Sequence, residues 1–191
     1  METIQKIMVC FLRNKTPMTI REISKNIHAD YRITHTAVQR LLTKKILLAQ
    51  TVGSSSLCRL NPAYYGVEIY LAENKRKEEI LKNSTIKQLY KELLAKIDTS
   101  LFILLLFGSY ALGAQTKNSD IDLMFITNDQ TFEEKVSTIL SLLPLKTHAL
   151  VFTEEEFIRM KDAKKPTVIQ EAIEKNIILY GIENFYHLKH A

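Results

Sequence analysis

Seven consecutive apolar residues, Leu101 to Phe107, end at Gly108 and constrain the fold of this chain more than any other feature. A run of this length that stops at a glycine is typical of a strand buried on both faces, and it is too short to cross a lipid bilayer. A second block, 119–126, alternates acidic and apolar residues and predicts another strand, which begins at the acids. Together the two blocks predict an α/β or α+β domain built around a sheet.

The acids of the second block are Asp120 and Asp122. Residues two apart in a strand point to the same face, so both carboxylates are expected on one side of the sheet. Two neighbouring carboxylates are costly unless a cation neutralises them, and oxygen ligands of this kind suit Mg²⁺. A purely structural role would not compensate the cost of placing the two carboxylates side by side. We therefore interpret the pair as a metal site.

Gly108 and Ser109 form a turn that follows the first strand and opens a helix. Such a turn offers backbone N–H groups and a hydroxyl to phosphate oxygens. Gly113 and Ser119 complete the pattern. Each also has a simpler explanation, because a glycine often ends a helix with a positive φ and a serine often caps an element.

The order G-S-x-x-x-G, five residues, then S-D-x-D-L resembles the nucleotidyltransferase superfamily that includes DNA polymerase β, and within it the small minimal nucleotidyltransferases of prokaryotes. The resemblance covers residues 84–191 and extends to Ile177–Gly181 and Phe185-Tyr186 near the end. It implies a mixed sheet flanked by helices.

The resemblance also implies a site. Asp120 and Asp122 would be the catalytic, Mg²⁺-holding residues, and ATP or another NTP would be the donor substrate. Nucleotide-binding residues would be Gly108, Ser109, Gly113 and Ser119. Attack on the α-phosphate would transfer NMP to an acceptor and release pyrophosphate.

This sequence departs from the family pattern at two places. A third carboxylate is expected on a later strand, but the next predicted strand, 146–152, has His148 where the acid would stand, and imidazole is a weaker partner for Mg²⁺. Glu154, Glu155 and Glu156 follow, but acids at that point favour the first turn of a helix. Leu112 occupies a position where many relatives have a basic residue. Nucleotide binding is compatible with both departures, whereas transfer chemistry is left open.

Residues 1–62 predict a separate helical domain. Apolar residues recur at helical spacing over 3–13, and Thr19 with Glu22 forms a capping-box pattern that opens a short helix. A third helix follows the turn at 28–31, and 47–52, a turn at 53–56 and 57–60 predict a hairpin. This order resembles the winged helix-turn-helix family.

That resemblance implies that the third helix enters the major groove of double-stranded DNA. Segment 1–62 has ten Lys and Arg against three Asp and Glu, which suits a polyanion. Gln39 and Arg40 could contact base edges, while other polar residues of the helix could contact phosphates. The expected DNA-binding residues are Thr34, His35, Thr36, Gln39, Arg40, Lys44 and Lys45. A protein-interaction module with a solvated polar face is the alternative.

Mixed charges over 63–83 predict a linker helix, with Tyr65, Ile69 and Tyr70 as a potential homodimer contact. Operator-binding winged helices commonly act as symmetric pairs, and a homodimer is therefore expected. Cys10 and Cys58 lie in apolar patterns and are expected to be buried thiols. With no signal peptide pattern and no membrane segment, a cytoplasmic location is expected.

Two functional hypotheses follow. In the first, the chain is an NMP transferase, with a protein hydroxyl or a nucleic acid as acceptor and the winged helix as a recruiting domain. In the second, it is a winged-helix transcriptional regulator whose nucleotidyltransferase-like domain only binds or senses a nucleotide. A protein-binding module that uses neither activity is a third reading.

Overall fold

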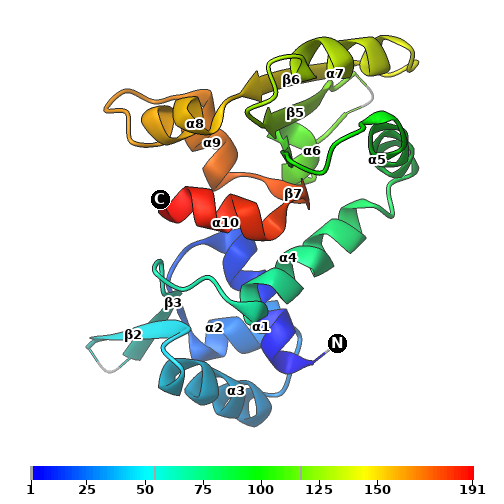
Figure 1. Ribbon diagram of the computed structural model, residues 1–191. Coiled ribbons are helices and arrows are strands. Elements are labelled where there is room, and N and C mark those ends of the chain that lie inside the picture. Colours follow the sequence, from blue (N-terminus) through cyan, green and yellow to red (C-terminus); the bar gives the residue numbers. More distant parts are fainter. Residues whose placement is uncertain (1, 54, 117) are drawn as a thin grey trace. The chain divides into compact units, whose positions relative to one another are not determined.

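The structure is a computed structural model that describes residues 2–53, 55–116 and 118–191. The chain divides into two compact units, one that ends at Lys75 and one that starts at Arg76. This division falls inside helix α4 (Val67–Ile80), within the segment 63–83 where a linker helix was expected. Figure 1 labels the helices of both units and those strands for which there is room.

The first unit has the order helix, short strand, helix, helix, hairpin. Its elements before α4 are α1 (Thr3–Asn14), β1 (Met18–Thr19), α2 (Ile20–Asn26), α3 (Tyr31–Thr43), β2 (Leu47–Val52) and β3 (Ser55–Leu60). The three strands form an antiparallel sheet in the order β1-β3-β2. The sequence did not indicate β1, because a strand of two residues is too short to show an alternating pattern.

Side-chain caps define where the helices of this unit begin. Thr19 Oγ1 accepts a hydrogen bond from Glu22 N, and the Glu22 carboxylate accepts one from Thr19 N at 2.7 Å, which confirms the predicted capping box. Asp30 Oδ1 accepts hydrogen bonds from the backbone N–H groups of Arg32 and Ile33 at the start of α3. These acceptors satisfy N–H groups that have no partner inside the helix.

The hairpin is longer than expected. β3 starts at Ser55, which pairs with Val52 of β2, whereas a turn was expected over 53–56. Ser54, in that expected turn, lies outside the described residues. Cys58 of β3 and Cys10 of α1 are free and buried, which confirms the expectation of two unbridged thiols, and burial raises the pKa of both.

The second unit is built on a mixed four-stranded sheet in the order β6-β5-β4-β7. Its strands are β4 (Ile103–Phe107), β5 (Ile121–Ile126), β6 (Thr147–Phe152) and β7 (Ile177–Tyr180). β4 runs antiparallel to β5 and β7, while β5 and β6 are parallel. The predicted strands are therefore present, although β4 starts at Ile103, where its pairing with β5 begins, and Leu101 is exposed to solvent.

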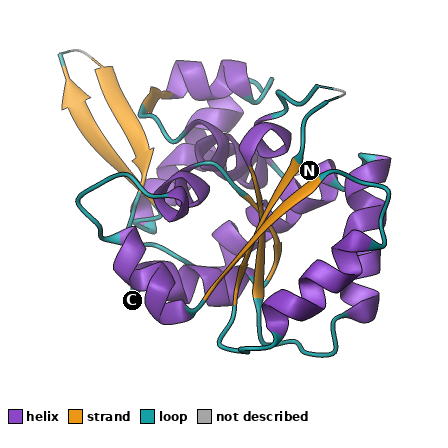
Figure 2. Ribbon diagram, turned by 90° about the horizontal axis from the view of Figure 1, so that it is seen from above, coloured by secondary structure: helices purple, strands orange, loops and turns teal. Residues whose placement is uncertain are grey.

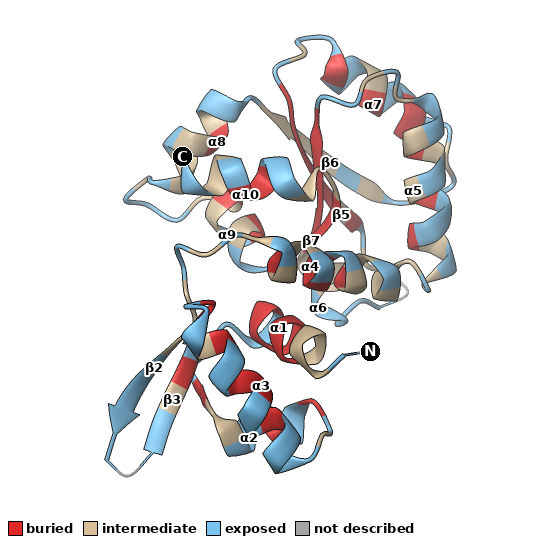
Figure 3. Cartoon of the chain, turned by 60° about the horizontal axis from the view of Figure 1, so that its bottom comes forward, coloured by how far each residue is buried: buried red, intermediate tan, exposed pale blue. Residues whose placement is uncertain are grey.

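Helices cover both faces of this sheet (Figure 2), as expected. On one face α5 (Ser84–Lys96) and α7 (Phe132–Ser141) pack over the core strands, where Leu104 and Leu106 of β4 meet Leu123 and Phe125 of β5. On the other side α9 (Val168–Glu174) and α10 (Ile182–His190) contact β4. β4 and β5 are largely buried, whereas most of β6 is intermediate, as Figure 3 shows for β5 and β6.

Two further helices of the second unit each follow a strand of the sheet. α6 (Gly108–Leu112) follows β4 directly, and α8 (Glu154–Lys161) follows β6. Thr153 and Glu156 form a capping box at the start of α8, so the run of glutamates does form the first turn of a helix, as predicted. Within the described part of the chain, the helices lack the combination of length and apolar character that a membrane crossing requires.

Gly181, between β7 and α10, provides a test of the fold. Its φ is +76°, and a Cβ there would lie 2.9 Å from the backbone oxygen of Phe102. We predict that Gly181→Ala lowers the free energy of unfolding by about 1–2 kcal/mol for the left-handed backbone and by about 1–3 kcal/mol more for the clash. Gly113→Ala is the control, because Gly113 has a similar φ but open space around it. Equal urea midpoints for the two variants would contradict this assignment.

Candidate functional site

The junction of β4 and α6 brings a backbone turn against a carboxylate. Phe107, the last residue of β4, pairs with Asp122 of β5, and Gly108 follows with a φ of +65°. A Cβ at Gly108 would lie 3.0 Å from Cγ of Asp122 and closer still to Oδ2. Only a residue without a side chain fits this approach. The structure therefore places Gly108 directly beside Asp122.

Asp120 and Asp122 occupy different settings. Asp122 lies in β5 with its side chain 27% exposed, so the strand sets its direction. Asp120 is exposed and precedes the strand, which begins at Ile121 and not at the acids. Asp122 therefore lies within the strand, and Asp120 lies just before it.

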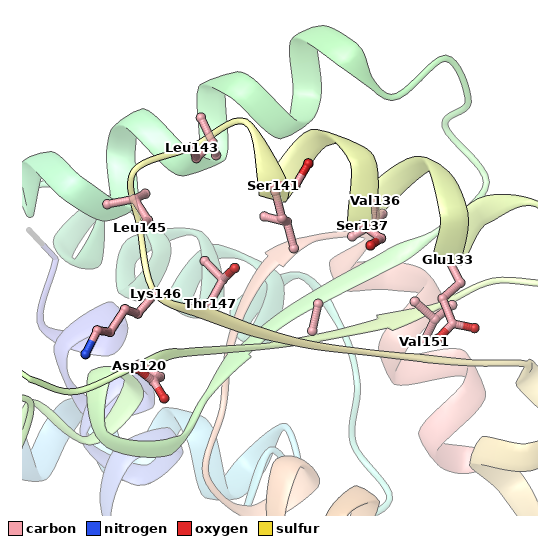
Figure 4. Close-up of a pocket in the computed structure, with 12 residues that line it drawn as sticks. Asp120, Glu133, Val136, Ser137, Ser141, Leu143, Leu145, Lys146, Thr147 and Val151 are labelled. Atoms are coloured by element: carbon pink, nitrogen blue, oxygen red, sulfur yellow. The ribbon is translucent and has the colours of Figure 1, made fainter.

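Asp120 borders a hollow of about 700 Å³ between α7 and the edge strand β6 (Figure 4). Apolar side chains such as Val136 and Leu145 form much of its wall, and Lys146 lies near Asp120 at one end. Asp122 and Ser109 do not line this hollow. The hollow is thus on the α7 side of β6, whereas the contact between Gly108 and Asp122 is at the end of β4.

His148 is the residue of β6 that pairs with Asp122 in the parallel register of β5 and β6. Its Nδ1 lies 3.6 Å from Oδ1 of Asp122, and its side chain is 61% exposed. The structure therefore places an imidazole beside the acid, at the position where the sequence pattern anticipated a third carboxylate. A neutral imidazole offers one nitrogen as an acceptor, and a protonated one offers only donors.

The other predicted nucleotide-binding residues have local structural roles. Gly113 ends α6 in the left-handed region, with a φ of +68°. Its role as the residue that ends a helix is therefore sufficient to explain a glycine at this position. Ser119 Oγ accepts a hydrogen bond of 2.9 Å from Thr116 N, which shapes the loop before β5. Ser109 is half-buried in the first turn of α6, next to Gly108.

These residues suit a magnesium ion that brings its own oxygen ligands. Among the described residues, no three His, Cys, Asp or Glu side chains gather closely enough to hold a metal ion by themselves. Mg²⁺ in nucleotide sites, however, commonly uses one or two carboxylates, with phosphate oxygens and water completing its shell. The Asp122 carboxylate packs against the bare backbone of Gly108. A metal–triphosphate complex therefore fits this donor set.

In the first unit, most of the predicted DNA-binding residues lie on the exposed side of α3. His35, Gln39 and Arg40 are exposed. Thr36 is also exposed, but its hydroxyl donates to the carbonyl of Arg32 at 3.0 Å. These four residues share one helix surface that a partner could reach.

The assignment of Thr34 to a phosphate contact is wrong. Thr34 is fully buried, and its hydroxyl donates to the carbonyl of Asp30 at 2.8 Å. The helical period places position 34 with Ala37, Val38 and Leu41 on the buried face of α3. A hydroxyl bonded to the preceding turn is easily accommodated on that face, so burial and polarity do not conflict here.

Lys44 and Lys45 follow the end of α3 and are both exposed. The Lys44 ammonium lies 3.2 Å from the Glu68 carboxylate, which also accepts a hydrogen bond from the Tyr64 hydroxyl. Burial and the contact with Glu68 raise the pKa of Tyr64 to about 12, so its hydroxyl stays a donor. The partnership of Lys44 with Glu68 spans 24 residues and had no signal in the sequence.

The suggested dimer contact on the linker helix is partly wrong. Ile69 is fully buried within the chain, whereas Tyr65 is 38% exposed. Ile69 is therefore unavailable to a second copy.

The comparisons with known proteins bear on the second unit. A family model described as "Polymerase beta, Nucleotidyltransferase" matches residues 85–184. No curated protein matches the chain significantly. One solved structure, a toxin-antitoxin crystal structure with AMP-PNP, is similar over 55% of this chain and 79% of that chain, at 25% identity and a TM-score of 0.39. A TM-score this low supports no conclusion about fold or activity.

The family match covers the Gly108 turn, both aspartates and His148, and it spans more than half of the chain. This protein belongs to the polymerase beta nucleotidyltransferase family.

Proposed function

We propose that this chain binds a nucleoside triphosphate, with ATP as the expected donor, together with Mg²⁺, and transfers NMP to a hydroxyl of a protein or nucleic acid. The observation that supports this most directly is the approach of the Gly108 backbone to the Asp122 carboxylate. In a member of this family, a turn that binds phosphate would then lie next to an acid that binds the metal.

The proposed step is a displacement at phosphorus. An oxygen of the acceptor hydroxyl forms a bond to the α-phosphorus, the bond from that phosphorus to the α–β bridging oxygen breaks, and pyrophosphate leaves with that electron pair. The hydroxyl proton passes to solvent or a nearby base. Mg²⁺, when bound with the triphosphate, supplies positive charge that offsets the charge developing on the phosphate oxygens.

The residues of the chain have distinct parts in this proposal. Asp122, and Asp120 beside it in sequence, would hold the ion. Gly108 would let the triphosphate approach the backbone, and Ser109 would donate its hydroxyl to a phosphate oxygen. Gly113 and Ser119 would support the shape of the turn and the loop, in line with the local bonds that they make.

Gly108→Ala tests the turn. The added methyl group would displace the Asp122 carboxylate, and we therefore expect the affinity for ATP–Mg²⁺, measured by calorimetry, to fall at least about tenfold, or about 1.4 kcal/mol. Gly113→Ala imposes a similar backbone strain in open space and should retain most of the affinity. Equal losses in both variants would show that strain in α6, and not the carboxylate, determines binding.

Transfer is tested with α-labelled ATP and Mg²⁺. We expect the label to appear on a protein or nucleic-acid acceptor in a cell extract, and we expect the double variant Asp120→Ala, Asp122→Ala to abolish it, because the ion would lose its protein ligands. Undiminished labelling by the double variant would rule out this site. Glu171→Ala on α9 serves as the control, since it removes an exposed acid elsewhere in the unit.

We further propose that the first unit is a winged helix that binds double-stranded DNA as a symmetric pair, with α3 in the major groove. Three observations support this: the order of elements, the excess of Lys and Arg over 1–62, and the exposure of His35, Gln39 and Arg40 on one helix surface. Lys45 adds a charge that would contact phosphate. Lys44 could do so by exchanging Glu68 for a phosphate, because an exposed ion pair is worth only about 0–1 kcal/mol.

Arg40→Ala is the corresponding test, made in the full-length chain. If Arg40 contacts a base edge, its loss should weaken binding to a selected duplex by about 1–3 kcal/mol, measured by fluorescence anisotropy at fixed salt. Lys91→Ala removes the same charge from exposed α5 of the second unit and should change little. The affinity of the unsubstituted chain should fall steeply as salt rises. A chain that binds no duplex at low salt would refute the proposal.

One observation favours the second candidate function, a DNA-binding regulator that senses a nucleotide without transferring it. His148 stands beside Asp122 where a third acid would assist transfer. Nucleotide binding without any labelled acceptor would support this candidate over the transferase.

A further inference from the structure

The residue beside Asp122 on the neighbouring strand β6 is a histidine, His148. His148 is paired with Asp122 by the register of β5 and β6, and the two side chains face each other at 3.6 Å. Both are partly open to solvent, with 61% of the His148 side chain and 27% of the Asp122 side chain exposed. The bulk of the ring therefore occupies the position next to the acid.

Two other acids of this unit lie away from the pair. Glu156 accepts hydrogen bonds from Thr153 in the capping box of α8. Glu133 lines the hollow on the α7 side of β6, away from the residue pair. Within the part of the chain that the structure describes, no group of three metal-binding side chains forms. At this place the protein thus offers a metal the carboxylate of Asp122, with the imidazole of His148 beside it.

The chemistry of Mg²⁺ then limits how many ions can bind. Mg²⁺ demands oxygen ligands in octahedral geometry and dehydrates reluctantly, so a ring nitrogen is a poor substitute for a carboxylate. A pair of ions about 3.5–4 Å apart needs further anionic oxygens to offset the repulsion between them. An ion that arrives on the triphosphate brings phosphate oxygens with it, whereas a second ion would depend on the protein.

We propose that this chain holds a single Mg²⁺ per bound nucleotide, the ion that the triphosphate brings, and that His148 is the residue that excludes a second. This inference rests on the proposed function, because it counts the ions at the same site. On this proposal, His148 determines how many Mg²⁺ ions bind. Replacing this one exposed side chain would then be sufficient to add an ion.

The test measures metal and nucleotide together. The full-length chain is dialysed to equilibrium against Mg²⁺ and α,β-methylene-ATP, which cannot transfer its nucleotide. The excess of each on the protein side is then measured by elemental analysis and absorbance. We expect a ratio of about one Mg²⁺ per bound nucleotide for the unsubstituted chain. His148→Asp should raise it about twofold by supplying a further carboxylate beside Asp122. Molecules that fail to fold retain no nucleotide and do not enter the ratio.

Two further variants separate the outcomes. His148→Glu provides a longer carboxylate in case the aspartate is too short to reach the second ion. Thr138→Asp adds the same charge on the exposed surface of α7, outside the hollow that Asp120 borders, and its ratio should stay near one.

A ratio of two in the unsubstituted chain would overturn the inference, as would an unchanged ratio in both His148 variants or a doubled ratio in Thr138→Asp. If the unsubstituted chain retains no nucleotide, the proposed function itself fails, and that result is distinct from a wrong ratio.

Discussion

The antiparallel pairing of β4 with β5 is the constraint on which the second unit depends. It sets Phe107 opposite Asp122, so the chain must turn away at once, and Gly108 does so with a positive φ that brings bare backbone against the carboxylate. The two strands are held by apolar packing under α5 and α7. The same burial that stabilises the sheet therefore also sets the position of the acid and the turn.

Much of this arrangement could be predicted from the sequence because its signals are local. The continuous apolar run of β4, the alternation in β5 and the capping pattern of Thr19 with Glu22 each report their structure within a few residues. His148 was anticipated from its place in the next strand, and the register confirms that place. The mixed sheet with helices on both faces was also expected, and it is present.

The features that the sequence did not reveal depend on contacts or on strand ends. Lys44 meets Glu68 across 24 residues, and no periodicity encodes such a pair. Thr34 was assigned to a phosphate because of its polarity, but a threonine can be buried when its hydroxyl bonds to the preceding helical turn. Asp120 was expected to share the pleat with Asp122, but β5 begins one residue later, and strand boundaries are set by pairing, which a single segment does not show.

The outer position of β6 has a consequence for how such a protein can change. β6 has a neighbour on one side only, and its side chains are less buried than those of the inner strands. A substitution on β6 removes little packed surface. A functional side chain on this strand can therefore be gained or lost by a single mutation without unfolding the domain. The Gly108 turn and Asp122 lie on the buried inner strands and have no such freedom. The fold thus separates fixed site residues on the inner strands from replaceable ones on the edge strand β6.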